Sequence, residues 1–109
     1  MIAWDRVSIL RHEIGPDGFG EVVELFLAEV EEALDGLHPG LDAPAFEAGL
    51  HFLKGSALNL GFSALAELCQ AGESAAAQGQ TDVNLDQVRA VYAASRDQFL
   101  AGLRARLDG

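Results

Sequence analysis

The chain has 109 residues, and 17 Asp and Glu against 7 Lys and Arg give it a formal net charge of −10. Half of the residues are apolar, so one hydrophobic core can form without disulfides or a metal, and a disordered tail is excluded. The single cysteine excludes an internal disulfide framework and fits a reducing compartment. We therefore expect one domain over residues 1–109, located in the cytoplasm.

Charge placement excludes several classes of partner. The segment Met1–Ile14 carries charged residues and lacks the apolar centre of a secretion signal, and the longest uncharged stretch, Gly55–Ala66, is shorter than the ~18 apolar residues of a membrane span. Between Arg11 and Lys54 there are ten acidic residues and no Lys or Arg. Such a surface repels phosphate backbones and anionic lipids, so we expect no binding to nucleic acid or membranes.

The first third of the chain predicts two helices. Ala and Leu supply 34 residues and Val, Ile and Thr only 11, a balance that favours helix over strand. Apolar positions in Ala3–Ile14 predict a short helix that covers one end of the domain. From Pro16 to Leu37 apolar residues recur at spacings of three and four, which predicts a long helix with Pro16 in its first turn.

Three further long helices are predicted after a Pro-Gly break. Asp42 is the expected cap of the next helix, and Gly61 ends it. Ser63 is the expected cap of a helix that runs through Ala77, and Asn84 begins the last one. Four amphipathic helices with short connections pack as antiparallel neighbours, so the sequence predicts an all-α, antiparallel up-down four-helix bundle with a short additional N-terminal helix. Its polar outer faces predict a monomer.

One histidine has an unusual position in this pattern. His51 lies about 140° around the helical wheel from the apolar stripe that contains Phe46, so it faces solvent in the middle of a helix. Gly55 follows one turn later, although a glycine inside a helix costs about 1 kcal/mol relative to alanine. The missing side chain would leave room for another molecule to approach the imidazole.

The run His51–Gly61 resembles the signature of histidine phosphotransfer (HPt) domains. Nine defined positions of that pattern match, namely His51, Leu53, Lys54, Gly55, Ser56, Ala57, Asn59, Leu60 and Gly61. The chain departs from the family at Leu50 and Phe52, where small or polar residues are usual. We expect Leu50 to point into the core and Phe52 to the far flank, so that neither blocks the site.

The resemblance implies a stoichiometric phosphocarrier rather than an enzyme. His51 would take a phosphoryl group from the aspartyl phosphate of a receiver domain, or from a kinase, and pass it to another receiver. Its partners would be response-regulator receiver domains and a hybrid histidine kinase. HPt domains carry no Mg²⁺ site of their own, because the receiver holds the metal, so we expect no cofactor and no metal site on this chain.

Three residues are expected to perform the chemistry. An imidazole is largely neutral at cytoplasmic pH, so a ring nitrogen of His51 keeps a lone pair for attack. The ammonium of Lys54, one turn away, would support the anionic transition state. His51 lies eleven residues before Phe62 and Glu73 eleven after it, so two helices that meet there place them side by side. We expect Glu73 to accept a hydrogen bond from Nδ1 of His51 and leave Nε2 to attack.

The residues around His51 on the same helix face predict the receiver-docking surface. They are Glu47 and Ala48 one turn before it, Gly55 one turn after it and Leu58 two turns after it. An apolar patch from the exposed parts of the N-terminal helix and the first two long helices would complete that surface.

Two other interpretations remain open at this point. The chain could be a helical docking module that binds a receiver or kinase without carrying phosphate, or the phosphoaccepting domain of a chemotaxis-type or hybrid kinase. Met1 and a complete bundle favour an independent protein over the latter.

Overall fold

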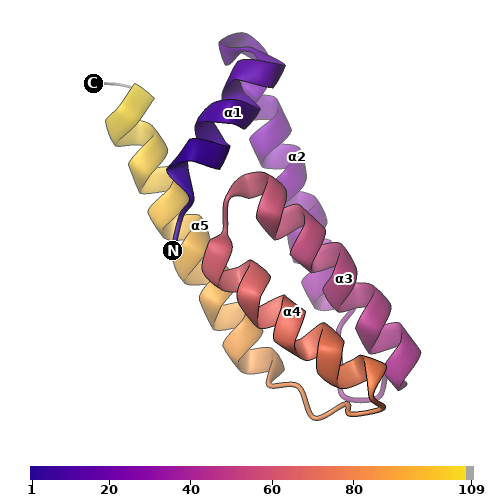
Figure 1. The fold of residues 1–109 in the computed structure, drawn as a ribbon. Coiled ribbons are helices and arrows are strands. Elements are labelled where there is room, and N and C mark those ends of the chain that lie inside the picture. Colours follow the sequence, from indigo (N-terminus) through magenta and orange to yellow (C-terminus); the bar gives the residue numbers. More distant parts are fainter. Residues whose placement is uncertain (108–109) are drawn as a thin grey trace.

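The structure, a computed structural model, describes residues 1–107, which contain five α-helices and a single isolated β-bridge. The helices are α1 (Trp4–Ile14), α2 (Pro16–Asp35), α3 (Ala43–Leu60), α4 (Ser63–Ala77) and α5 (Leu85–Leu107) (Figure 1). The predicted all-α bundle with an additional N-terminal helix is confirmed. The prediction of one domain over 1–109 includes residues 108 and 109, which lie outside the described part. The bundle measures 46 × 20 × 20 Å.

Local signals in the sequence explain where α3 begins and ends. The Asp42 carboxylate accepts a hydrogen bond from the backbone N–H of Ala45 at 3.0 Å, which satisfies one of the free donors of the first turn. Gly61 ends the helix in the left-handed region, at φ +77°, where a side chain would be strained and would also press on the backbone of Ala3. The predicted cap and stop of this helix are therefore both present.

The start of α4 differs from the prediction. Ser63 is already inside the helix and Phe62 occupies the cap position without a side-chain cap. The hydroxyl of Ser63 donates instead to the backbone oxygen of Met1, at 2.8 Å. The expectation that Ser63 caps α4 was wrong, because the N-terminal segment lies close enough to compete for its hydroxyl.

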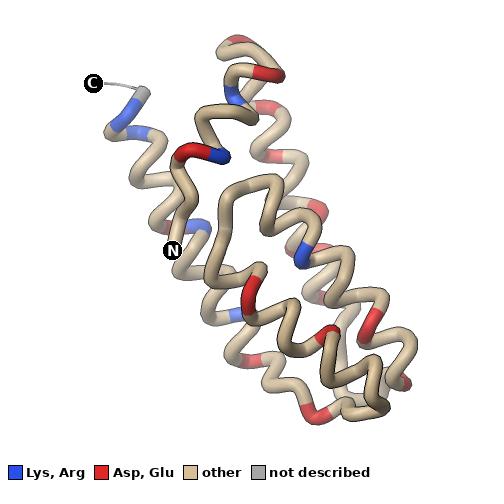
Figure 2. The backbone as a smooth tube through the Cα atoms, viewed as in Figure 1, with Lys and Arg blue, Asp and Glu red and all other residues tan. Residues whose placement is uncertain are grey.

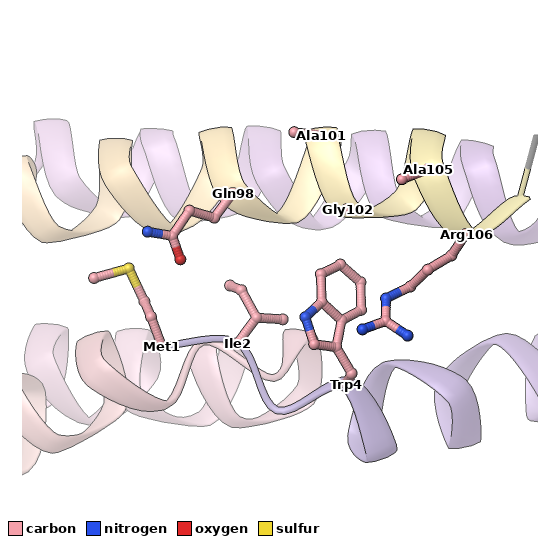
Figure 3. Close-up of a pocket in the computed structure, with 8 residues that line it drawn as sticks. All are labelled: Met1, Ile2, Trp4, Gln98, Ala101, Gly102, Ala105 and Arg106. Atoms are coloured by element: carbon pink, nitrogen blue, oxygen red, sulfur yellow. The ribbon is translucent and has the colours of Figure 1, made fainter.

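The N-terminal segment fastens the α3–α4 turn to α5. The backbone N–H of Ala3 donates to Gly61 at 2.7 Å, next to the bridge between Ile2 and Phe62. Trp4 then stacks on Phe99 of α5, with ring centroids 6.1 Å apart, as Phe62 packs edge-on against the same ring. Figure 3 shows the Trp4 ring between the N-terminal segment and α5, beside the guanidinium of Arg106.

A glycine on α5 makes room for this arrangement. A Cβ atom at Gly102 would overlap the six-membered ring of Trp4. The indole therefore lies directly on the backbone of α5, with the Arg106 guanidinium 4.2 Å from its ring centroid. These contacts fix α1 and the turn between α3 and α4 relative to the rest of the bundle.

Charge is distributed unevenly over the helices. Figure 2 shows acidic residues along α2, basic residues mainly on α1 and α5, and one basic residue on α3. That residue is Lys54, the only Lys or Arg in α2, α3 and α4. None of the helices within residues 1–107 is both long and apolar enough to cross a membrane.

Candidate functional site

His51 projects from the middle of α3, on the side that faces α4. Its neighbours Leu50 and Leu53 are fully buried, so the core contacts of α3 fix the rotation of the helix and turn His51 outward. The His51 side chain is 68% exposed. A histidine held on a rigid helix and open to solvent is accessible to a large partner.

Glu73 of α4 holds one nitrogen of the His51 ring. Its Oε1 atom lies 2.7 Å from Nδ1 of His51, which is the contact expected from the positions of both residues about Phe62. A carboxylate accepts hydrogen bonds, so this distance assigns the proton to Nδ1. In the neutral ring the lone pair is then on Nε2, the nitrogen that Glu73 does not contact.

Lys54 shares the same carboxylate. Its Nζ atom lies 2.8 Å from Oε2 of Glu73 and donates to Oε1 of Gln70 at 2.9 Å. Gln70 in turn donates from Nε2 to the hydroxyl of Ser74 at 3.0 Å. Before any partner binds, the ammonium therefore lies against α4, on the Nδ1 side of the His51 ring.

The charge state of Glu73 follows from these contacts. The hydrogen bond from Lys54 lowers the pKa of the carboxyl most, and the hydrogen bond from His51 lowers it further against the opposing effect of partial desolvation. Glu73 is therefore a carboxylate at neutral pH, as both contacts require. Cys69 lies beneath it, and burial first, then the Glu73 charge, raise the pKa of its thiol to about 11. The thiol stays protonated and behaves as part of the core, as its apolar spacing predicts.

A shallow hollow lies beside His51 and contains part of the predicted docking surface. Its volume is about 450 Å³, and it is lined by Pro44, Glu47, Ala48, His51 and Glu73. A Cβ atom at Gly55 would meet no atom within 4 Å, so the surface one turn after His51 is bare backbone.

Leu58 belongs to a different part of the surface. It is 54% exposed and lines a separate hollow near the end of α3, together with Arg6 and Asn59. Phe52 is 48% exposed, and Leu50 is fully buried, as expected for these two departures from the HPt pattern. The predicted docking residues therefore extend along α3 without forming one cavity.

Sequence analysis did not identify Gln70 and Ser74. The signal was present, because Lys54 lies eight residues before Phe62 and Gln70 lies eight residues after it. The rule that pairs His51 with Glu73 across the turn also pairs Lys54 with Gln70. Ser74 then follows Gln70 by four residues, the spacing that places two side chains on one helix face.

Metal binding at this site has no support in the described structure. Among residues 1–107, no group of three or more His, Cys, Asp or Glu side chains is arranged to hold a metal ion. The side chains that meet at the site are an imidazole, a carboxylate and an ammonium.

Comparison with protein families gives the class of the protein. The Hpt domain model matches residues 21–108, and neither the curated proteins nor the solved structures gave a match. The chain therefore belongs to the Hpt domain family, which comprises phosphotransfer modules of two-component signalling that interact with receiver domains and histidine kinases. The match begins inside α2, so α1 and its contacts with α5 lie outside it.

The shared carboxylate generates a prediction about pH. The Lys54→Met substitution removes the strongest cause of the low Glu73 pKa, so we expect that pKa to rise toward its ordinary value. A carboxyl group with a lowered folded-state pKa adds stability above the unfolded-state pKa and loses it as the pH falls through the folded-state value. The Lys54→Met variant should therefore lose less stability than the wild type on acidification from neutral pH.

Carboxyl ¹³C NMR titration measures the Glu73 pKa directly, and urea unfolding at neutral and acidic pH measures its effect on stability. Arg104→Met is the matched control, since it removes one charge from the last turn of α5 and is not among the groups that shift Glu73. A Glu73 titration that is the same in wild type and Lys54→Met would contradict the assigned ion pair.

Proposed function

We propose that this protein carries a phosphoryl group on Nε2 of His51 and transfers it to or from the aspartate of a receiver domain. The observation that carries the proposal is the contact of 2.7 Å between Nδ1 of His51 and Glu73, on a ring that is otherwise open to solvent. One ring nitrogen is held and the other is available. A carboxylate at one ring nitrogen fixes the tautomer and orientation of the imidazole, and membership of the Hpt domain family supports the assignment.

The transfer step balances without any further reactant. The Nε2 lone pair of His51 attacks the phosphorus of an aspartyl phosphate, a bond forms from nitrogen to phosphorus, and the bond from phosphorus to the aspartyl oxygen breaks. The electron pair of that bond stays on the departing carboxylate. The Nδ1 proton remains on the ring, and the reverse sequence returns the phosphoryl group to a receiver. The protein is thus a stoichiometric carrier rather than an enzyme.

Glu73 and Lys54 have complementary electrostatic roles in this step. Positive charge develops on the imidazole as the bond from Nε2 to phosphorus forms, and the Glu73 carboxylate at Nδ1 stabilises it. The phosphoryl oxygens are anionic throughout the transfer, and the ammonium of Lys54 stabilises their negative charge. One Glu73 oxygen contacts His51 and the other contacts Lys54. The carboxylate and the ammonium therefore both lie next to the His51 ring.

The partner is a receiver domain that docks over Gly55. Bare backbone at this position allows the acidic pocket of a receiver, with its own Mg²⁺, to approach Nε2 closely. Glu47, Ala48 and Leu58 form the surrounding contact surface along α3, and a hybrid histidine kinase is a second expected partner. We place the protein in the cytoplasm as a monomer, on the basis of its unpaired cysteine and the polar outer faces of its helices.

The proposed function generates a prediction about His51 itself. Incubation with a phosphorylated receiver should give the wild type a phosphoadduct that is labile in acid and stable in alkali, and His51→Gln should gain none. The matched control is His12→Gln, which removes an exposed histidine from α1 and should leave the adduct unchanged. A wild type that binds the receiver without gaining phosphate would identify a docking module instead.

A further prediction separates the effect of Gly55 on docking from its effect on folding. Gly55→Gln places a side chain in open space on a helix, so it should raise the free energy of unfolding by up to about 1 kcal/mol. The same side chain obstructs the approach to Nε2, and the transfer rate should fall about tenfold or more, because small misplacements of reacting groups are costly.

Urea unfolding and the rate of phosphoryl transfer from the receiver measure the two effects. Gly20→Gln, at another helical glycine with open space around it, should give the gain in stability without the loss in rate. If Gly55→Gln transfers phosphate as fast as the wild type, the receiver does not approach over this position.

A further inference from the structure

The side chain of Gln70 makes a contact that phosphotransfer, as described so far, does not use. Its Oε1 atom accepts from the ammonium of Lys54 at 2.9 Å, although Gln70 contacts neither His51 nor the hollow beside it. We infer that Gln70 is a positioning residue for the phosphotransfer at His51, and that it acts by fixing the ammonium of Lys54. This inference rests on the proposed function and names a residue that acts on the same site through another side chain.

The flexibility of the Lys54 side chain makes a second partner useful. A lysine carries a point charge on a stem of four carbons, and a single ion pair leaves the ammonium free to move around its partner. Here the ammonium forms an ion pair with Oε2 of Glu73 at 2.8 Å and donates a hydrogen bond to Oε1 of Gln70 at 2.9 Å. Two partners define the position of the ammonium, whereas a single ion pair would not. The Lys54 side chain is accordingly only 21% exposed.

The ammonium of Lys54 only donates, so it determines which way the Gln70 amide faces, and Ser74 accepts from the other end of the amide. The amide nitrogen donates to the Ser74 hydroxyl at 3.0 Å, so the amide oxygen points to Lys54. The reverse orientation would place two groups of N–H donors against each other. Gln70, Glu73 and Ser74 stand at helical spacings of three and four on α4, so one face of this helix supplies both partners of the ammonium and the hydroxyl that accepts from the amide.

The position of this ammonium matters because the helices around it supply no second cation. Lys54 is the only Lys or Arg in α2, α3 and α4, and seven acidic residues lie on α2 alone. A charge that moves away from the site must be brought back at a cost in entropy when the anionic transition state forms. If the ammonium of Lys54 is fixed in advance at the carboxylate that also holds His51, it stays beside the ring that reacts.

A double-mutant cycle tests this inference in the phosphotransfer reaction. Gln70→Ala should slow the transfer of phosphate to His51 about threefold to tenfold, the range that one hydrogen bond of ordinary strength supports. Gln78→Ala, which removes the same side chain from the exposed end of α4, is the matched control and should not change the rate. In a Lys54→Met background Gln70→Ala should cause no further loss, since Gln70 acts only through Lys54.

Two results would overturn the proposed role of Gln70. A loss that is the same in the wild-type and Lys54→Met backgrounds would mean that Gln70 acts on the fold or on docking. A Gln70→Ala variant with the wild-type rate would mean that Lys54 needs no second acceptor. Urea unfolding of each variant checks that the bundle is intact, which we expect because Gln70 is exposed.

A spectroscopic measurement tests the contact without any partner. Because Lys54 is the only lysine, protein labelled with ¹⁵N-lysine gives a single side-chain ammonium signal. Gln70→Ala should speed the exchange of its protons with water and increase its motion, whereas Gln78→Ala should not; unchanged exchange in Gln70→Ala would overturn the inference. If the wild type gains no phosphate, the proposed function fails, and this signal still reports whether Gln70 holds Lys54.

Discussion

The site depends on one carboxylate that joins two helices. Glu73 reaches from α4 to α3 and places its two oxygens on two different groups, Nδ1 of His51 at 2.7 Å and the ammonium of Lys54 at 2.8 Å. The hydrogen bond from Lys54 is the main reason for the low pKa of this carboxyl, so each contact supports the other. Without Glu73, the imidazole would rotate freely and the ammonium would lose its strongest partner.

The close packing of α3 on α4 brings Glu73 within reach of His51 and Lys54. The turn at Gly61 and Phe62 sets which residues of the two helices face each other, and the N-terminal segment holds that turn through the hydrogen bond from Ala3 to Gly61. Gly72, directly before Glu73, lies against Leu50, and a Cβ atom there would come within 2.9 Å of the Leu50 side chain. A small residue at this point lets the helices approach, so a glutamate is long enough to contact His51.

The sequence predicted the helices, the caps at Asp42 and Asn84 and the stop at Gly61, because these depend on local chemistry. It also predicted that His51 would be exposed. Burying the apolar stripe of α3 allows only one rotation of the helix about its axis, and that rotation turns His51 toward solvent. The pairing of His51 with Glu73 followed from equal distances about the turn. Equal distances about the turn also pair Lys54 with Gln70, a contact that was not predicted.

Contacts between segments distant in sequence were harder to predict. Ser63 donates to Met1, 62 residues away, instead of capping α4, and only the packed N-terminal segment shows why. Likewise, the contacts of the Lys54 ammonium with Glu73 and Gln70 were not predicted from the sequence. Helical periodicity determines which face a lysine lies on, whereas the direction of its flexible stem depends on the acceptors that the neighbouring helix supplies.

The central claim is that Glu73 holds Nδ1 of His51 and leaves Nε2 to take the phosphoryl group. Long-range ¹H–¹⁵N NMR of the phosphorylated protein, labelled at histidine nitrogen, distinguishes the two ring nitrogens directly. We expect phosphorus on Nε2, with the proton on Nδ1 in the unphosphorylated neutral ring. Phosphorus on Nδ1 would contradict this expectation, because the nitrogen that contacts Glu73 would then be the one that reacts.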